Sequence, residues 1–425
     1  MPLIKNPDKS KWDELARRPV VENALLEKTV KKILAKVKAQ GDKALKKITK
    51  ELDGVKLKKI AVTDKEIKAA ASLMPEELKE AIQQAKANIE KFHSRQTEGN
   101  NEIEIIPGIK CWRKSVGIEK VGIYIPGGSA PLFSTVLMLG VPAQIAGCRE
   151  IVLCTPPLKD GNIHPAILYT ATLCGIKNIF KVGGSQAIAA MAYGTETIPK
   201  VFKIFGPGNQ YVTCAKQLVQ LENVAIDMPA GPSELLVIAD DKAIPEFVAA
   251  DLLSQAEHGT DSQVIVATTS ESIAEKVQYS IKEQLKELPR KKIATQALKN
   301  SKIILFQNLR DAIEFSNLYA PEHLIIACEN ANELSGQVIS AGSVFIGNYS
   351  PESAGDYASG TNHTLPTTGY AAMYSGVSVD SFVKKISFQA LSQSGLQHIG
   401  KSVELMAEAE GLQAHANAIS IRLKK

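Results

Sequence analysis

The stretch VGIYIPGGSAPLFSTVLM, residues 121–138, carries the fold signal from which the rest of the chain can be interpreted. The apolar, β-branched run Val121–Ile125 predicts a buried strand. Pro126-Gly-Gly-Ser predicts a tight turn, and a helix is expected near 133–147. Three further strand–turn–helix units follow it. Their strands are Glu150–Cys154, Asn178–Val182 and Val201–Phe205, and their helices lie near 163–174, 186–193 and 209–220.

A second series of short apolar runs begins after residue 230. These runs alternate with helix-length segments, as expected for parallel strands that are sandwiched by helices. We therefore expect an α/β protein with two doubly wound, incomplete Rossmann-like lobes. The strands of the second series are Leu235–Ala239, Gln263–Ala267, Lys302–Phe306, Leu324–Cys328 and Val344–Gly347, and the helices lie near 245–257, 270–287 and 309–317.

Helical periodicity predominates at both ends of the chain. Residues 10–95 read as helical, and helices are also expected over Ser381–Leu391 and His398–Gln413. A chain of 425 residues exceeds one ordinary core, so a division into parts is expected. The predicted parts are an N-terminal arm (1–20), a first α/β lobe (21–123 plus 236–377), a second lobe (124–235) that binds the cofactor, and a helical tail (378–425).

Composition narrows the function classes. Hydrophobic residues make up 44% and aromatic residues 5%, which is typical of a soluble α/β enzyme. Residues 1–60 hold 17 Lys and Arg against 8 Asp and Glu. These basic residues fall on predicted amphipathic helices, and the sequence contains no known nucleic-acid-binding motif, so no nucleic-acid partner is expected. The charge-free run Val121–Cys148 is broken by glycine and proline, so no membrane span is expected either.

Six scattered cysteines, without a C-x-x-C pair, predict free thiols in a reducing compartment. The N-terminus lacks the apolar core of a signal peptide, so a cytoplasmic location is expected. A catalytic thiol is not expected, because neither Cys111 nor Cys148 has a basic group nearby in the sequence. The cysteines are Cys111, Cys148, Cys154, Cys174, Cys214 and Cys328.

Three glycine-rich turns follow predicted strands of the first series. They are Pro126-Gly-Gly-Ser, Gly183-Gly-Ser-Gln186 and Gly206-Pro-Gly-Asn209. Glycine lets backbone amides approach phosphate, and the positive end of the next helix adds to the attraction. None completes the G-x-G-x-x-G fingerprint, and each alone is compatible with a simple tight turn. A nucleotide crevice and a purely structural role therefore both remain open at this point.

Four polar fragments of the second half offer groups that bind metals or move protons. Gln255 and His258 stand three apart at a predicted helix end, where Gly259 and Thr260 place them at an exposed lip. Amide oxygen is an uncommon zinc ligand, so the residues alone slightly favour a capped helix end with a solvated histidine over a metal site. Asp356, expected in a loop, could form an Asx-turn, and His415 could lie on a helix surface.

Glu322 and His323 are adjacent at the entrance of a predicted strand. Such a pair suits acid–base work, because histidine titrates near neutral pH and a carboxylate can activate water. Neighbours on a strand point opposite ways, so both serve one site only if the pair lies in a loop. Two surface charges at a strand edge are the alternative. His363 lies in a Gly/Thr-rich loop of the kind that closes over substrates, whereas His93, His164 and His398 have ordinary helix or turn neighbours.

Longer motifs resemble those of the histidinol dehydrogenase family, from about residue 20 to 420. The resemblance implies a cytosolic, zinc-dependent homodimer that oxidises L-histidinol through L-histidinal to L-histidine with two NAD⁺. The motifs are VGIYIPGGSAPLFSTVLM, FGPGNQYV, DMPAGPSELLVIAD, DLLSQAEHG, YAPEHLII, GDYASGTNHTLPT and EGLQAHANAI.

The resemblance also implies roles for individual residues, all of whose types are present here. It implies that the tail is exchanged between subunits, so that Glu410 and His415 complete the partner's site. The implied bases are Glu322 and His323. The implied zinc ligands are Gln255, His258, Asp356 and His415; the NAD contacts are Tyr124, Gln186 and Asn209; the substrate contacts are Ser233, Gln255, His258, His323, Asp356, His363, Glu410 and His415.

Two rival functions follow from the residues alone. A zinc hydrolase could use Glu322 to activate metal-bound water, but it would have no need of the glycine-rich turns. A two-lobed binding protein for a small ligand would need no chemistry, but it would not require the Glu322–His323 pair.

Overall fold

The computed structural model describes residues 1–425 except 20–23, 98, 100, 128–130 and 425. Its largest sheet has six parallel strands in the order β1-β11-β10-β9-β12-β13. Their bounds are Leu3–Lys5 (β1), Glu234–Ala239 (β9), Gln263–Thr268 (β10), Lys302–Leu305 (β11), His323–Ala327 (β12) and Ser343–Ile346 (β13). This is the predicted doubly wound arrangement.

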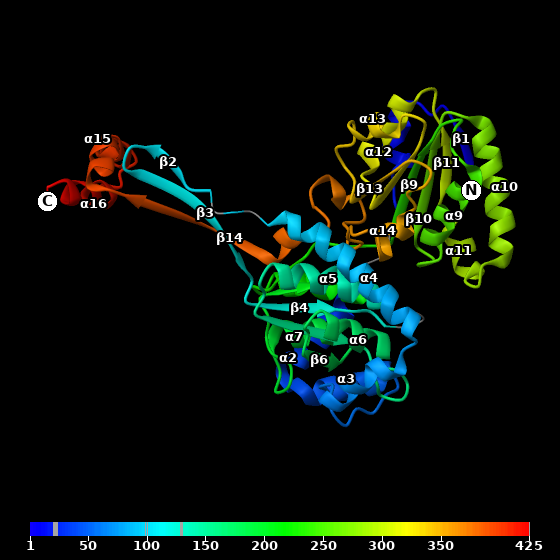
Figure 1. Ribbon diagram of the computed structural model, residues 1–425, viewed down its shortest axis with the longest axis horizontal. Helices are drawn as coiled ribbons and strands as arrows, with labels where there is room; N and C mark the ends of the chain where they lie inside the picture. The colour runs from blue at the N-terminus through cyan, green and yellow to red at the C-terminus, as the bar shows by residue number, and fades with distance from the viewer. Residues whose placement is uncertain (20–23, 98, 100, 128–130, 425) are drawn as a thin grey trace.

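Helices cover both faces of the six-stranded sheet (Figure 1). On one face lie α9 (Pro245–Ala256), α10 (Glu271–Glu287) and α11 (Lys291–Ala297), packed on Leu235, Val237 and their neighbours. On the other lie α1 (Trp12–Leu15), α12 (Leu309–Tyr319) and α13 (Ala331–Ser335). The strands are buried on both faces, which explains their continuous apolar sequences.

The second sheet has five parallel strands in the order β6-β5-β4-β7-β8. The chain order reverses between β4 and β7, a switch point at whose carboxyl edge doubly wound sheets bind ligands. The strands are Lys120–Tyr124 (β4), Glu150–Thr155 (β5), Asn178–Lys181 (β6), Lys203–Phe205 (β7) and Ala225–Ile226 (β8). The intervening helices are Phe133–Ile145 (α5), Pro165–Leu173 (α6), Gly184–Tyr193 (α7) and Gln210–Gln220 (α8).

The helices between residues 24 and 93 pack on this five-stranded sheet, whereas α1 packs on the six-stranded one. Helices α3 (Asp64–Ala70) and α4 (Glu76–His93) join α5 and α6 on one face, and α2 (Ala24–Leu52) joins α7 and α8 on the other. The expected grouping of 21–123 with 236–377 therefore does not match the packing. Amphipathic helices show which face is apolar but not which sheet it will cover. The expected boundary at 20/21 lies outside the described residues.

An arm projects from the two lobes (Figure 1). It is a three-stranded antiparallel sheet of β2 (Ile103–Ile106), β3 (Ile109–Gly117) and β14 (Val383–Leu391), followed by α15 (Gln393–Ala409) and α16 (Gln413–Leu423). The helix expected over Ser381–Leu391 is wrong. This segment pairs with β3 along its length, and Phe388 stacks on Trp112 with ring centres 5.4 Å apart. Cross-strand pairing thus decides its structure.

The remaining short elements connect these parts. They are the six-residue helix α14 (Glu352–Tyr357) and the 3-10 turns η1 (Lys9–Lys11), η2 (Ala71–Leu73), η3 (Ser94–Gln96), η4 (Tyr370–Ala372) and η5 (Val379–Phe382). All six cysteines are free, as predicted. The charge-free run Val121–Cys148 contains β4 and α5, and across the described residues no helix combines the length and hydropathy needed to cross a bilayer.

Candidate active site

The candidate catalytic residues gather where β9 and β12 begin. These strands are neighbours at the switch point of the six-stranded sheet, and His323 pairs with Leu235 in their register. The site thus lies at the amino edge of this sheet, although doubly wound sheets usually bind ligands at the carboxyl edge. The five-stranded sheet supplies the facing carboxyl edge.

The side chains of Glu322 and His323 lie at one site. This is possible for neighbouring residues because only His323 belongs to the strand. Glu322 lies in the bend after Pro321, so strand alternation does not direct its side chain away. Both are buried, at 7% and 3% exposure. Glu322 Oε2 accepts hydrogen bonds from the backbone N–H of Glu234 (2.9 Å) and from Gln255 Nε2 (3.3 Å).

The imidazole of His323 is held by the same segment of β9. Its Nδ1 lies 3.2 Å from the carbonyl oxygen of Glu234. A carbonyl only accepts, so this hydrogen bond keeps a proton on Nδ1, and Nε2 is the atom at which the ring gains or loses its second proton. Nε2 is buried without a hydrogen-bond partner and lies 3.5 Å from Asp356 Oδ1.

Gln255 and His258 differ in their exposure. Gln255, in the last turn of α9, is completely buried, whereas His258, just beyond the helix, is exposed. The expectation that both stand on an exposed lip is therefore wrong for Gln255. The Nε2 atom of Gln255 lies 3.3 Å from Glu234 O, Glu322 Oε2 and His323 Nδ1, while its buried Oε1 has no hydrogen-bond partner.

Asp356 and His363 close the site from the side of α14. Asp356 belongs to this short helix and not to a loop, because the six residues Glu352–Tyr357 form a helix after Pro351. His363 lies in a loop, as expected, and its Nδ1 donates to the carbonyl oxygen of Asp356 (2.9 Å). Its Nε2 lies 3.0 Å from Thr135 Oγ1 on α5, so this histidine connects the two lobes.

Buried charges shift several pKa values here. Burial alone would lower the pKa of His323, but the carboxylates of Glu322 and Asp356 raise it well above its usual value. Burial would raise the pKa of Asp356, but the neighbouring His323, His363 and His258 lower it. Burial also raises the pKa of Glu352 to about 8. The sequence analysis did not single out Glu352, because it resembles any acidic residue in a first helical turn.

The residues expected to meet the cofactor lie at the carboxyl edge of the five-stranded sheet. Tyr124 ends β4, and its hydroxyl accepts a hydrogen bond from the backbone N–H of Gly184 (3.0 Å). Gln186 lies in the first turn of α7, and its buried Oε1 has no hydrogen-bond partner. Asn209 caps α8 by accepting from the N–H groups of Tyr211 and Val212. Two residues of the first glycine-rich turn, Gly128 and Ser129, lie outside the described residues.

The turn Gly206-Pro-Gly depends on glycine and on a buried ion pair. Gly206 has φ 125°, and a Cβ there would collide with the carbonyl oxygen of Tyr124. Asp227 Oδ2 accepts from the Gly206 N–H (2.8 Å), and Lys216 Nζ donates to the Gly206 carbonyl (2.9 Å). Lys216 and Asp227 also pair with each other. The sequence analysis did not single out Lys216 or Asp227, because a lysine within a helix and an aspartate after a short strand carry no local signal of a role.

A cavity of about 120 Å³ lies between the amino edge of the six-stranded sheet and the carboxyl edge of the five-stranded sheet. Its walls include Gly206–Gly208 from one lobe, and Ser233, Glu322 and His363 from the other part of the chain. A ligand in this cavity could therefore contact the glycine-rich turn and the carboxylate of Glu322 together. Such an arrangement suits transfer between a bound nucleotide and a substrate beside Glu322 and His323.

Glu410 and His415 are not brought to this site within one chain. Both are exposed. Glu410 is the C-terminal cap of α15 and His415 belongs to α16, and Figure 1 shows these two helices at the far end of the arm, well away from α9 and α14. The structure therefore assembles Gln255, Asp356, His323 and His363, with His258 close enough to influence Asp356, and leaves the two tail residues outside.

Comparison with known proteins agrees with the motifs. The family model for histidinol dehydrogenase matches residues 16–423. The chain belongs to the histidinol dehydrogenase family. It is 59% identical to a histidinol dehydrogenase of Bacteroides fragilis and 60% identical to one of Bacteroides thetaiotaomicron, each over 100% of this chain and 99% of the relative.

A solved structure supports the same assignment. The crystal structure of histidinol dehydrogenase from Elizabethkingia anophelis superposes with a TM-score of 0.98 at 60% identity, over 100% of this chain and 98% of that one. The predicted α/β fold and the predicted NAD-dependent dehydrogenase class are therefore confirmed. The hydrolase and binding-protein alternatives do not agree with this membership.

The fit of the residues to a metal ion can be judged from their donors. Within the described part of the chain, no three or more His, Cys, Asp and Glu side chains are grouped to hold a metal. The zinc ligands that the family resemblance implies would not form a group of this kind within one chain, since they include the amide of Gln255 and the tail residue His415. Gln255 Nε2 lies 3.3 Å from His323 Nδ1, and Asp356 Oδ1 lies 3.5 Å from His323 Nε2, so both side chains lie next to this ring. The buried, unpartnered Oε1 of Gln255 and the carboxylate of Asp356 are oxygen donors compatible with a cation such as zinc.

Asp251, one turn before Gln255 on α9, gives a prediction about stability. Burial raises the pKa of its carboxyl to about 7, far above the value of an unfolded chain. The folded state therefore holds this proton more tightly, so ionisation destabilises the fold as pH rises from about 4 to 7. We expect Asp251→Asn to stabilise the protein by about 2 kcal/mol at pH 8, after allowance for partial exposure, and by progressively less toward pH 5.

Urea unfolding at fixed protein concentration measures this difference. Asp241→Asn is the matched control, because the Asp241 side chain is 74% exposed and its removal should change the free energy of unfolding little at either pH. An Asp251→Asn advantage that stayed the same at pH 5 and pH 8 would contradict the assignment of the effect to this carboxyl.

Proposed function

We propose that this chain oxidises L-histidinol to L-histidine through L-histidinal, with two NAD⁺ in succession, as the final steps of histidine biosynthesis. The observation that carries the proposal is the buried Glu322–His323 pair beside a cavity that reaches the Gly206–Gly208 turn. Histidinol dehydrogenases of Bacteroides that are 58–60% identical along the whole chain support it. A biosynthetic role and the free cysteines are in keeping with a cytoplasmic location.

His323 would act as the base of the alcohol step. Because its Nδ1 is committed to the carbonyl of Glu234, its Nε2 is the atom that would accept the hydroxyl proton while hydride leaves for the nicotinamide. Each hydride carries two electrons, so one NAD⁺ becomes NADH in each step. Tyr124, Gln186 and Asn209 would hold the cofactor at the facing sheet edge.

Glu322 would act in the second half of the reaction. Its Oε2 is occupied by Glu234 N–H and Gln255, and the residue lines the cavity, so its other oxygen is available to take a proton from water. That water would hydrate the aldehyde to a gem-diol, and His323 would remove the proton of the diol as the second hydride leaves. Keeping the aldehyde in a buried site also protects it from side reactions.

The metal would be held by Gln255, His258 and Asp356 of one chain and by His415 of a second chain. Zinc, when bound, would anchor the substrate by binding the imidazole and the amine of histidinol. Substrate contacts would also come from Ser233, His323, His363 and Glu410. The exposed position of Glu410 and His415 at the end of the arm supports their use by another subunit.

Dimerisation by exchange of the tail also explains the surface of the arm. Several apolar side chains of the arm are exposed in the single chain, and exposed apolar side chains that lie together are typical of interaction surfaces. A second copy would cover them and would place α16 beside the neighbouring site. The residues concerned are Ile386 (40%), Phe388 (38%), Leu405 (53%), Met406 (66%), Leu412 (43%) and Ile421 (60%).

A coupled assay tests the proposal. We expect NADH formation from L-histidinol and NAD⁺, at two NADH per histidinol consumed. Because a Lewis acid contributes several kcal/mol to such sites, chelation should lower the rate by about 10²-fold or more, and added zinc should restore it. No rise in NADH absorbance with histidinol, for a folded and zinc-supplied protein, would refute the proposed activity.

A further inference from the structure

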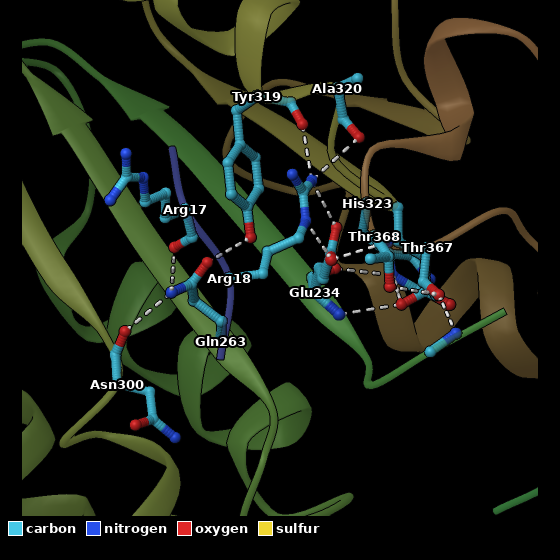
Figure 2. A network of polar contacts seen from close by, with 12 residues as sticks. Arg17, Arg18, Glu234, Gln263, Asn300, Tyr319, Ala320, His323, Thr367 and Thr368 are labelled. Atoms are coloured by element: carbon cyan, nitrogen blue, oxygen red, sulfur yellow. Dashed lines mark hydrogen bonds and ion pairs between the residues drawn. The ribbon is translucent and has the colours of Figure 1, made fainter. Parts of the chain in front are cut away.

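Arg18 and Glu234 form a buried ion pair directly behind the catalytic residues (Figure 2). Arg18 follows α1 in the N-terminal segment, and Glu234 is the first residue of β9. The contact is bidentate, with Nε 2.5 Å from Oε1 and Nη2 2.9 Å from Oε2. The side chains are only 17% and 2% exposed. Two charges are removed from water here, so a specific role for them is expected.

The guanidinium also holds the turn that leads into Glu322. Arg18 Nη2 donates to the carbonyl oxygens of Tyr319 (2.6 Å) and Ala320 (3.4 Å), and the guanidinium lies 4.0 Å from the centre of the Tyr319 ring. Ala320 has φ 49°, a left-handed conformation that is unfavourable for a residue with a Cβ. This strained residue is two positions before Glu322, so its conformation directs the chain into the catalytic pair.

The carboxylate of Glu234 fixes a second strained residue on the opposite side. Its Oε1 accepts a hydrogen bond from the backbone N–H of Thr368 (2.7 Å), whose φ is 58°. Thr368 ends the loop that carries His363, and Figure 2 shows it beside Glu234 together with Thr367. One ion pair therefore connects the N-terminal segment, the turn before β12 and the loop of His363.

The backbone of Glu234 makes the direct contacts with both proposed bases. Its N–H donates to Glu322 Oε2 at 2.9 Å, and its carbonyl oxygen accepts from His323 Nδ1 at 3.2 Å. We propose that Arg18 is a positioning residue of this enzyme: it anchors Glu234, whose backbone orients the carboxylate of Glu322 and the imidazole of His323. The proposal rests on the catalytic roles given above to these two residues.

Arg18→Ala and Arg18→Lys test the proposal. Lysine keeps the charge but cannot bind the carboxylate and two carbonyls with a planar fork. We expect kcat for histidinol oxidation to fall by about 10- to 100-fold in both, because small displacements of reacting groups cost up to about that much. The KM for NAD⁺ should stay within about twofold, since the proposed cofactor contacts lie on the other lobe. Guanidinium ion added to Arg18→Ala should restore part of kcat.

Arg17→Ala is the matched control. It removes the same charge from the neighbouring position, and the Arg17 side chain points away from the network in Figure 2, where only its carbonyl is bound, by Gln263. Its kcat should match that of the unmodified chain, without a response to guanidinium. Should Arg18→Ala fail to fold, Arg18→Lys carries the comparison. A folded Arg18 variant with unchanged kcat, or one with a raised KM for NAD⁺ and no guanidinium rescue of Arg18→Ala, overturns the positioning role.

A second measurement separates this inference from the proposed function. The imidazole ¹⁵N shifts of His323, assigned by comparison with His323→Gln, report the hydrogen bond at Nδ1 without any substrate. We expect these shifts to change in Arg18→Ala and to remain unchanged in Arg17→Ala. If the unmodified chain does not oxidise histidinol, the proposed function fails, and the NMR comparison still decides the positioning role. Unchanged His323 shifts in Arg18→Ala overturn it.

Discussion

Glu322→Gln is expected to separate the two halves of the reaction. Glutamine has the shape of glutamate but cannot accept a proton from water, so oxidation of supplied L-histidinal should fall by about 10²- to 10⁴-fold. Oxidation of L-histidinol to the aldehyde should stay within about tenfold, because that step is assigned to His323. Single-turnover experiments that start from each substrate in turn measure the two steps separately.

The hydrogen bonds of Glu322 allow glutamine to replace it with little structural change. Its Oε2 accepts from both Glu234 N–H and Gln255 Nε2, so an amide placed there keeps its carbonyl oxygen toward these donors and turns its NH₂ toward the cavity. The substitution therefore removes the free carboxylate oxygen with little disturbance of the buried contacts. Changes in the histidinol step then measure only the loss of charge beside His323.

Glu329→Gln is the control for this experiment. Glu329 follows the other end of the same strand, where it is exposed and remote from the cavity, so both steps should keep their rates. If Glu322→Gln slowed the alcohol and aldehyde steps equally, the division of labour between Glu322 and His323 would be wrong. If it slowed the alcohol step alone, the two roles would have to be exchanged.

The sequence predicted the repeating strand–helix units because their signals are local. Apolar β-branched runs and glycine turns placed β4 to β7 and β9 to β13 close to where they lie. Two features depend on partners that are distant in the sequence. The helix predicted over Ser381–Leu391 was wrong, because Val383–Leu391 pairs with β3 as a strand. The helices between residues 24 and 93 pack on the five-stranded sheet, and their amphipathic pattern could not show which sheet they would cover.

The candidate site divides in the same way. A glutamate next to a histidine after proline was visible in the sequence, and so was the odd pair Gln255 and His258. Their environment was not, because burial of Gln255 depends on its packing between Glu234 and Glu322. Arg18 shows the limit most clearly. It lies 216 positions from Glu234, and nothing in its local sequence distinguishes it from Arg17.

Complementation between two inactive variants is expected to reveal tail exchange. His323→Ala removes the base from a subunit's own site, and His415→Ala removes the ligand that its tail would supply to the partner. Each homodimer should be nearly inactive. In a mixed dimer, the site that keeps His323 would receive an intact tail from the other subunit, so one of its two sites would be complete.

The expected size of the recovery follows from random assortment. Equal mixing gives hybrids as half of the dimers, each with one complete site, so activity should reach about a quarter of that of the unmodified enzyme. Mixing should follow reversible dissociation or co-expression of the two variants with different affinity tags, so that hybrids can be isolated and counted. As a control, His398→Ala replaces the tail's other histidine, which lies on α15, and should leave full activity.

The arrangement of the arm determines what a negative result would mean. In the single chain His415 belongs to α16, which Figure 1 shows at the far end of the arm, away from α9 and α14. To reach the site of its own chain, the whole arm would have to fold back, or β14 would have to give up its nine-residue pairing with β3. Isolated hybrids without activity would therefore show that His415 is not a shared ligand, and the metal site would then have to be completed by groups of the same chain.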